Sequence, residues 1–157
     1  MSTDDDIFLA VRESNADVAR WLGEVLEMAP VEDQPEEDDM VRLRGHARSV
    51  DGWLVLEVSR NGYVNYDPEE EIQAIDLYPI DVSIWYAGRK DEELQSHEAR
   101  LIFDKLIESR PEVPILLSHG LAMLTAAHLP GVGTKYFESG ITLDEPDLEA
   151  WMPWVVT

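Results

Sequence analysis

Two stretches of the chain repeat apolar residues at the three- and four-residue spacing of an amphipathic helix. In the first, Ser14 and Asn15 can cap a helix start, and the apolar positions that follow are Val18, Trp21, Leu22, Val25 and Leu26. This helix should end by Pro30. In the second, Asp91 can cap a helix from about Glu92 to Ser109, with Ala99, Ile102, Phe103 and Leu106 on one face. The pattern predicts two helices.

The clearest strand pattern lies between these helices. Apolar and basic residues alternate from 41 to 48, and apolar residues recur at every second position from 53 to 60. The turn signal at 49–52 joins them into a hairpin. A four-residue loop would place Arg44 opposite Glu57 and Arg48 opposite Trp53, and both pairings are chemically favourable.

Other apolar runs predict further strands at about 7–12, 80–87, 113–118 and 122–129, although a short helix fits the last run nearly as well. Strand, helix and hairpin then occur in that order twice, over roughly 7–60 and 80–129. We therefore expect an α+β fold in which one mainly antiparallel sheet carries both helices on one face. The opposite face would carry Arg42, Arg44, His46, Arg48, Trp53 and Glu57. At 157 residues the whole chain, 1–157, should form one domain, with its C-terminal aromatic residues packed on the body.

Charge changes this picture more than any other property. The chain has 33 acidic and 12 basic residues, a net charge of −21. Acids gather in predicted loops at 30–40 and 63–76. Such a surface repels nucleic acid and anionic lipid and attracts basic proteins. Cysteine is absent, no apolar run is long enough for a transmembrane helix, and the N-terminus lacks the basic start of a secretory signal, so we expect a cytoplasmic location.

Candidate chemistry is weak throughout the sequence. The four histidines lack the close spacing of a metal site, and the acidic loops lack a calcium-loop pattern, so neither a metal nor a cofactor is expected. Ser118 and His119 are adjacent, but sequence neighbours rarely form a nucleophile–base pair, and a turn is the better interpretation. The segment 131–135 fails the phosphate-loop pattern on spacing and order, which leaves a glycine loop. No catalytic residue is assigned.

The basic positions Arg42, Arg44, His46 and Arg48 allow two interpretations. They could bind an anion or an acidic peptide with Trp53, or they could be a solvated sheet face paired with nearby acids. The net charge favours the second.

We therefore expect a cytosolic protein that binds a basic protein partner. It would be an acidic inhibitor or immunity-type protein that covers a nuclease or a nucleic-acid-modifying toxin. Two alternatives stay open: a small enzyme with an unrecognised pocket, and an acidic housekeeping domain adapted to high salt. The expected partner contacts are the two acidic segments and one aromatic anchor, namely Glu32, Asp33, Glu36, Glu37, Asp38, Asp39, Glu69, Glu70, Glu71 and Tyr66.

Overall fold

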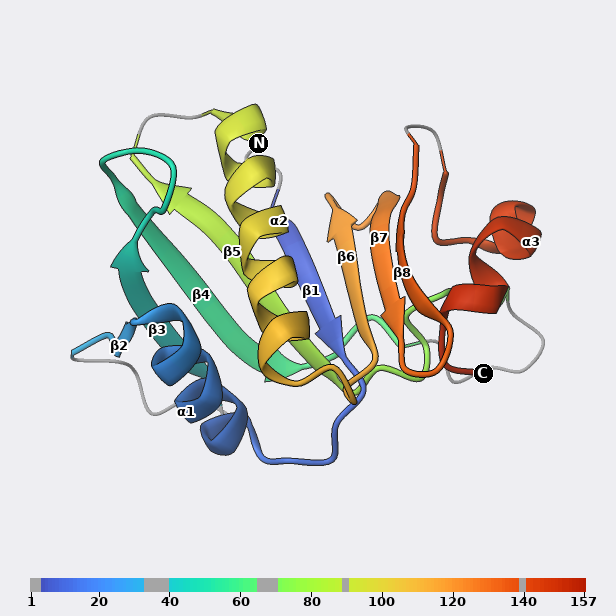
Figure 1. The fold of residues 1–157 in the computed structure, drawn as a ribbon, viewed down its shortest axis with the longest axis horizontal. Helices are drawn as coiled ribbons and strands as arrows, with labels where there is room; N and C mark the ends of the chain where they lie inside the picture. Colours follow the sequence, from blue (N-terminus) through green and yellow to red (C-terminus); the bar gives the residue numbers. More distant parts are fainter. Residues whose placement is uncertain (1–3, 33–39, 65–70, 89–90, 139–140) are drawn as a thin grey trace.

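The fold is an eight-stranded antiparallel sheet with its two long helices on one face, as seen in a computed structural model (Figure 1). The structure describes residues 4–32, 40–64, 71–88, 91–138 and 141–157. The strand order across the sheet is β2-β3-β4-β5-β1-β6-β7-β8. The strands are β1 (Asp5–Leu9), β2 (Ala29–Pro30), β3 (Val41–His46), β4 (Trp53–Arg60), β5 (Ile80–Ala87), β6 (Ile115–His119), β7 (Met123–Leu129) and β8 (Gly133–Tyr136). The α+β prediction is confirmed.

Both predicted helices are present and pack on the same face of the sheet, which we call the helix face. Helix α1 (Asn15–Leu26) begins where Ser14 Oγ accepts from the Asp17 N–H at 3.1 Å. Helix α2 (Glu92–Ser109) begins where Asp91 Oδ1 accepts from the Leu94 N–H at 3.0 Å. Their apolar stripes and the inward residues of β1 and β3–β6 form one buried core. No helix in the described residues is long and apolar enough to cross a membrane.

The hairpin of β3 and β4 is confirmed, but its predicted register is wrong by two residues. Arg42 lies opposite Glu57, Arg44 opposite Val55, and His46 opposite Trp53. The connecting loop is longer than four residues because Arg48 lies outside the strand, in the loop. There the Glu98 carboxylate of α2 accepts from the Arg48 N–H and, at 3.1 Å, from the Ser49 N–H. A shift of two residues keeps each side chain on its predicted face.

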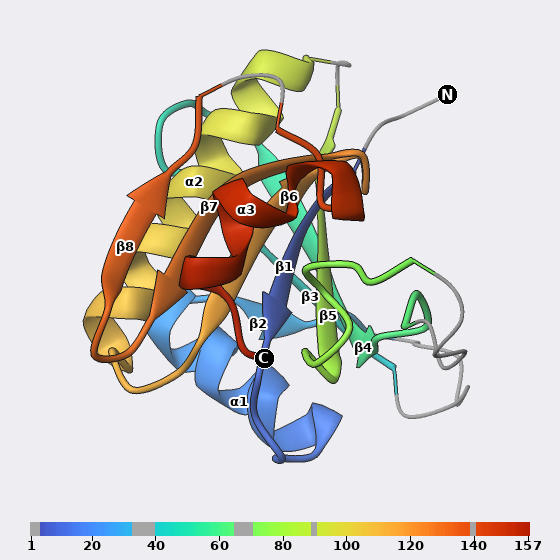
Figure 2. The same cartoon turned by 90° about the vertical axis from the view of Figure 1, so that its right-hand side faces the viewer.

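The opposite face of the sheet, which we call the back face, is covered at one end by the C-terminal segment (Figure 2). The C-terminal segment, with the short helix α3 (Leu148–Trp151), packs there on Phe8, Leu116 and Leu124. Residues 71–78, which the sequence predicted as loop or edge, also join this cluster through buried Ala74 and Ile75. The prediction that the tail packs on the body is confirmed, whereas α3 was not predicted.

The two strand–helix–hairpin halves of the chain, predicted at about 7–60 and 80–129, share one sheet because their central strands exchange partners. Each half begins with a strand that lies at the sheet centre, β1 in the first and β5 in the second, and these strands pair with each other. Strand β1 also pairs with β6 of the second half, and β5 also pairs with β4 of the first. Each central strand therefore borders a hairpin of the other half, which makes one continuous sheet.

Candidate functional site

The predicted partner-binding residues fall largely outside the described residues. Glu32 and Glu71 are described, and both are exposed. Asp33, Glu36, Glu37, Asp38, Asp39, Tyr66, Glu69 and Glu70 lie outside the described ranges. The two described positions are compatible with surface contact, and the structure does not bring them into one described cluster.

The predicted basic face exists on β3, but its side chains interact with their own sheet. The Arg42 Nε donates to Glu57 Oε2 at 3.0 Å. The Arg44 guanidinium lies 4.3 Å from the ring centre of Trp53, and the His46 ring stacks on the same indole with centres 4.0 Å apart. The stacking orders Trp53 but leaves it 38% exposed. This matches the paired, solvated interpretation of the basic positions.

Beside this basic row, the back face gathers four carboxyl groups. Asp6 of β1 lies opposite Ser83 of β5, which lies opposite Glu57 of β4, so one row of the sheet carries two acids. Asp81 lies two residues along β5 from Ser83, and its carboxyl group is close enough to Asp6 for the two to interact. Asp4 lies just before β1, close enough to Asp6 and Glu57 for electrostatic repulsion between their carboxylates. We call Asp4, Asp6, Glu57 and Asp81 the back-face acid cluster.

Burial and the repulsion of neighbouring acids oppose the ionisation of Asp4 and Asp81. Burial, followed by the hydrogen bond and charge of Asp6, raises the pKa of Asp81 far above its ordinary value. Burial and then the charges of its acidic neighbours raise the pKa of Asp4. Burial and the charges of this cluster also raise the pKa of Tyr63, which is 50% exposed beside it. The acids therefore lie close enough for the charge of one to disfavour ionisation of another.

The described contacts compensate only part of the cluster. Ser83 Oγ donates to Asp6 Oδ2 at 3.0 Å, and Glu57 pairs with Arg42. No ion pair in the described part of the chain involves Asp4, Asp6 or Asp81. Among the described residues, neither the buried Asp81 Oδ1 nor the buried Ser118 Oγ, opposite Asp6 on β6, has a hydrogen-bond partner. Buried polar groups without partners reduce stability, so this part of the face is not optimised for folding.

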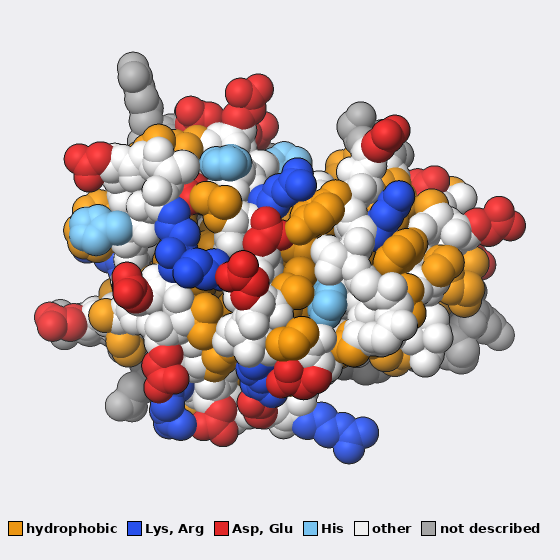
Figure 3. Space-filling view, in the orientation of Figure 1, with side chains coloured by type: hydrophobic (Ala, Val, Ile, Leu, Met, Phe, Trp, Pro, Cys, Tyr) orange, Lys and Arg blue, Asp and Glu red, His pale blue; other side chains and the backbone are white. Residues whose placement is uncertain are grey.

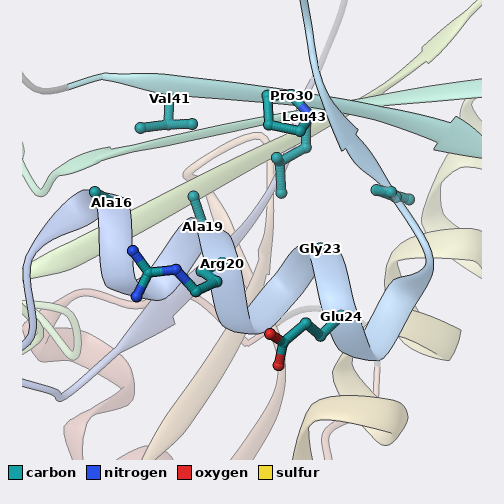
Figure 4. A pocket seen from close by; sticks show the side chains of 9 residues that line it. Ala16, Ala19, Arg20, Gly23, Glu24, Pro30, Val41 and Leu43 are labelled. Carbon is teal, nitrogen blue, oxygen red and sulfur yellow. The ribbon is translucent and has the colours of Figure 1, made fainter.

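A groove of about 480 Å³ lies between α1 and the edge strands β2 and β3 (Figure 4). It is open because α1 presents only the small residues Ala16, Ala19 and Gly23 toward Val41 and Leu43. The lining is mainly apolar, and its charged groups, Arg20 and Glu24, lie on the helix at the rim. No described segment covers the groove.

A second pocket, of about 470 Å³, lies on the helix face between α2 and strands β6–β8. At its wall, Asp5 of β1 and His119 of β6 are cross-strand neighbours. His119 Nδ1 lies 2.6 Å from Asp5 Oδ1, and Ser96 Oγ of α2 donates to Asp5 Oδ2 at 3.2 Å. Gln95 Nε2 also donates to Asp5 at 3.2 Å. Burial raises the pKa of Asp5, and these hydrogen bonds oppose the rise.

This pocket was missed from the sequence. His119 does end a strand before a turn, as predicted, and alternation sends Ser118 to the back face, so the two side chains do not meet. Asp5 lies within an acidic N-terminal run that resembles a solvated tail. The signal that pairs it with His119 is the sheet register, which joins residues 114 positions apart.

The other histidines have structural surroundings. His46 stacks on Trp53, and His97 is exposed on α2 at the pocket rim. His128 is buried and bridges Thr134 Oγ1 and the Pro111 carbonyl, each at 2.8 Å. Across the described ranges, no group of three His, Asp or Glu side chains is placed to hold a metal ion.

The helix face does not carry the acid surplus as a uniform field. Acidic and basic side chains are interspersed on it, with apolar patches between them (Figure 3).

Comparison of the chain with protein-family models, with curated proteins and with solved structures finds no match. The chemistry of its own surfaces is therefore the basis for a function.

Proposed function

We propose that the protein binds a basic protein partner in the cytoplasm, as an acidic inhibitor or immunity-type protein. The contact surface is the back face over β3–β5, where Trp53 is exposed and Glu57 and Trp85 are half-buried. The observation that supports this most is the back-face acid cluster, in which Asp4, Asp6 and Asp81 lack ion pairs with described residues. A cationic side chain of a partner, placed against the half-buried Asp4 and Glu57, would compensate the charge of the cluster, in which Asp6 and Asp81 are buried.

The residues around the cluster suit a protein contact. Trp53 and Tyr63 are large exposed aromatics, and the Trp85 side chain on β5 is half-buried. Trp, Tyr and Arg dominate the energetics of protein interfaces, and Arg44 lies on Trp53 in this same surface. The net charge of −21 would steer a basic partner toward the protein and raise the association rate at low salt.

Position-specific photo-crosslinking in the protein's own cells tests this proposal. A benzoylphenylalanine replaces Tyr63 beside the acid cluster or, as a matched control, Val132, which is similarly exposed at 53% in the β7–β8 turn. We expect the Tyr63 position to crosslink one basic protein, and the Val132 position not to. The proposal fails if the Tyr63 position gives no crosslinked protein, if its crosslinked protein is acidic, or if both positions give the same protein.

A further inference from the structure

The helix-face pocket exists because α2 is too narrow to cover the whole sheet. The helix packs on β1, β5 and β6, while β7 and β8 continue beyond it (Figure 1). Leu117, Met123 and Phe137 give the resulting hollow an apolar part. The polar part of its lining comes from Ser96, His97 and Arg100 of α2 and from the Asp5–His119 pair.

The Asp5–His119 contact directs one histidine nitrogen away from its partners. Nδ1 meets both Asp5 Oδ1 and, at 3.2 Å, Ser96 Oγ. No hydrogen bond to Nε2 forms with any described residue. A carboxylate at Nδ1 fixes the orientation of the imidazole ring and accepts a hydrogen bond from its Nδ1–H, so Nε2 is directed toward the pocket. Ser96 touches the nitrogen that Asp5 occupies, so it holds the pair in place and is not an activated nucleophile.

Arg100 brings a positive charge to the same pocket. It lies one helical turn after Ser96, and therefore on the same side of α2. Its guanidinium carbon is 4.1 Å from the ring centre of Tyr136, and no hydrogen bond or ion pair joins Arg100 to a described residue. Arg110, the residue that directly follows α2, instead forms ion pairs with Glu13 and Glu112. Asp104, one turn further along α2, accepts a hydrogen bond from the Tyr136 hydroxyl.

We propose that this pocket binds a small organic oxyanion, a carboxylate or a phosphate ester with a short apolar body. The oxyanion accepts from the Arg100 guanidinium and from a protonated His119 Nε2, and the apolar body lies on Leu117, Met123 and Phe137. The site is separate from the back-face acid cluster, since it lies on the other side of the sheet. In so acidic a chain, direct contacts and not long-range attraction must hold such a ligand.

The test is an NMR titration of the isotope-labelled full chain with butyrate and, separately, with inorganic phosphate, each to about 20 mM, which suits millimolar affinity. We expect saturable shifts of the His119 ring signals. Tighter binding of butyrate would identify a carboxylate with an apolar body, and tighter binding of phosphate a phosphate ester. Arg100→Gln should weaken binding about tenfold or more, as expected for loss of a charge-assisted contact. Lys105→Gln, an exposed change of equal charge on α2, should alter it less than about twofold.

The proposal is overturned if neither anion gives saturable shifts at His119, or if Arg100→Gln and Lys105→Gln have equal effects. Arg100 is exposed, so its replacement should leave the fold intact, and unchanged signals from the α1 side of the core would verify this. A His119→Gln variant adds a second reading, because it removes the Nε2 donor and keeps Arg100. Unchanged affinity in that variant would also contradict the proposal.

Discussion

The two ends of the back face are built from the same sheet but in opposite ways. Over β6–β8 the face is apolar and covered, with Leu116, Leu124 and Trp151 buried. Over β3–β5 it is polar and aromatic, and it holds the back-face acid cluster. The boundary runs through β1, where Asp6 and Phe8 are only two residues apart on this face. The covered end stabilises the fold, whereas the open end keeps buried acids that oppose folding. Such unoptimised groups are expected where a surface has another use.

Truncating Trp151 should break the covered end. Trp151 is 3% exposed, and its Nε1 donates to the Asp144 carbonyl at 3.0 Å. We expect Trp151→Ala to lower the free energy of unfolding by about 3–5 kcal/mol. Trp53→Ala, on the open end, should cost less than about 1 kcal/mol. Denaturant unfolding of both variants checks the contrast, and equal losses would show that the two ends do not differ.

Neutralising Asp81 should stabilise the protein. Its pKa is raised in the folded state, so the unfolded chain loses its proton first as pH rises above the ordinary value of 3.8. The folded state then becomes progressively less stable toward high pH, up to its own raised pKa. We expect Asp81→Asn to raise the free energy of unfolding by about 1–3 kcal/mol at pH 8, and by much less at pH 4.

Asp147 gives the matched control for this pH dependence. The Thr142 N–H and hydroxyl donate to its carboxylate at 2.7 and 2.8 Å and lower its pKa. Its stabilising effect is therefore present above the unfolded pKa and lost as pH falls toward the folded value. Asp147→Asn should destabilise at neutral pH, and thermal unfolding against pH should show the two variants changing in opposite directions. Parallel changes would refute the assignment.

Two serines on the back face should respond differently to removal. Ser118 Oγ is buried without a partner, so Ser118→Ala should leave stability unchanged or raise it by up to about 1 kcal/mol. Ser83 Oγ donates to Asp6, so Ser83→Ala should cost about 1 kcal/mol. Chemical denaturation at neutral pH separates them. A larger loss of stability in Ser118→Ala than in Ser83→Ala would show that the Ser83–Asp6 hydrogen bond does not stabilise the fold.

The smallest effect is expected at the Arg42–Glu57 ion pair. Both side chains are partly exposed, at 39% and 24%, and such pairs contribute little in water. We expect Arg42→Gln to change the free energy of unfolding by less than about 1 kcal/mol, with the difference shrinking at high salt. A larger loss would show that the open end also depends on this pair for its stability.

The sequence predicted most of the fold because local signals agree with packing. Each helix is defined by its cap, Ser14 or Asp91, and by the apolar stripe that follows that cap. The hairpin register was missed because its loop is set by Glu98, which lies on a helix about 50 residues away. The site residues Asp81 and Asp5 were not predicted, since a buried acid and an exposed acid look alike until the strands are paired.

The most direct test of the account measures how fast the protein associates with the basic partner crosslinked at Tyr63. We expect the rate constant to fall tenfold or more as salt rises from about 0.05 to 0.5 M. At low salt the double variant Asp4→Asn/Glu57→Gln should associate more slowly by about fivefold or more, because it removes two acids of the back face. The double variant Glu92→Gln/Glu93→Gln removes two exposed acids from the start of α2 and should change the rate by less than about twofold. A rate that does not depend on salt, or that falls equally in both variants, would contradict the claim that the back-face acids serve the partner.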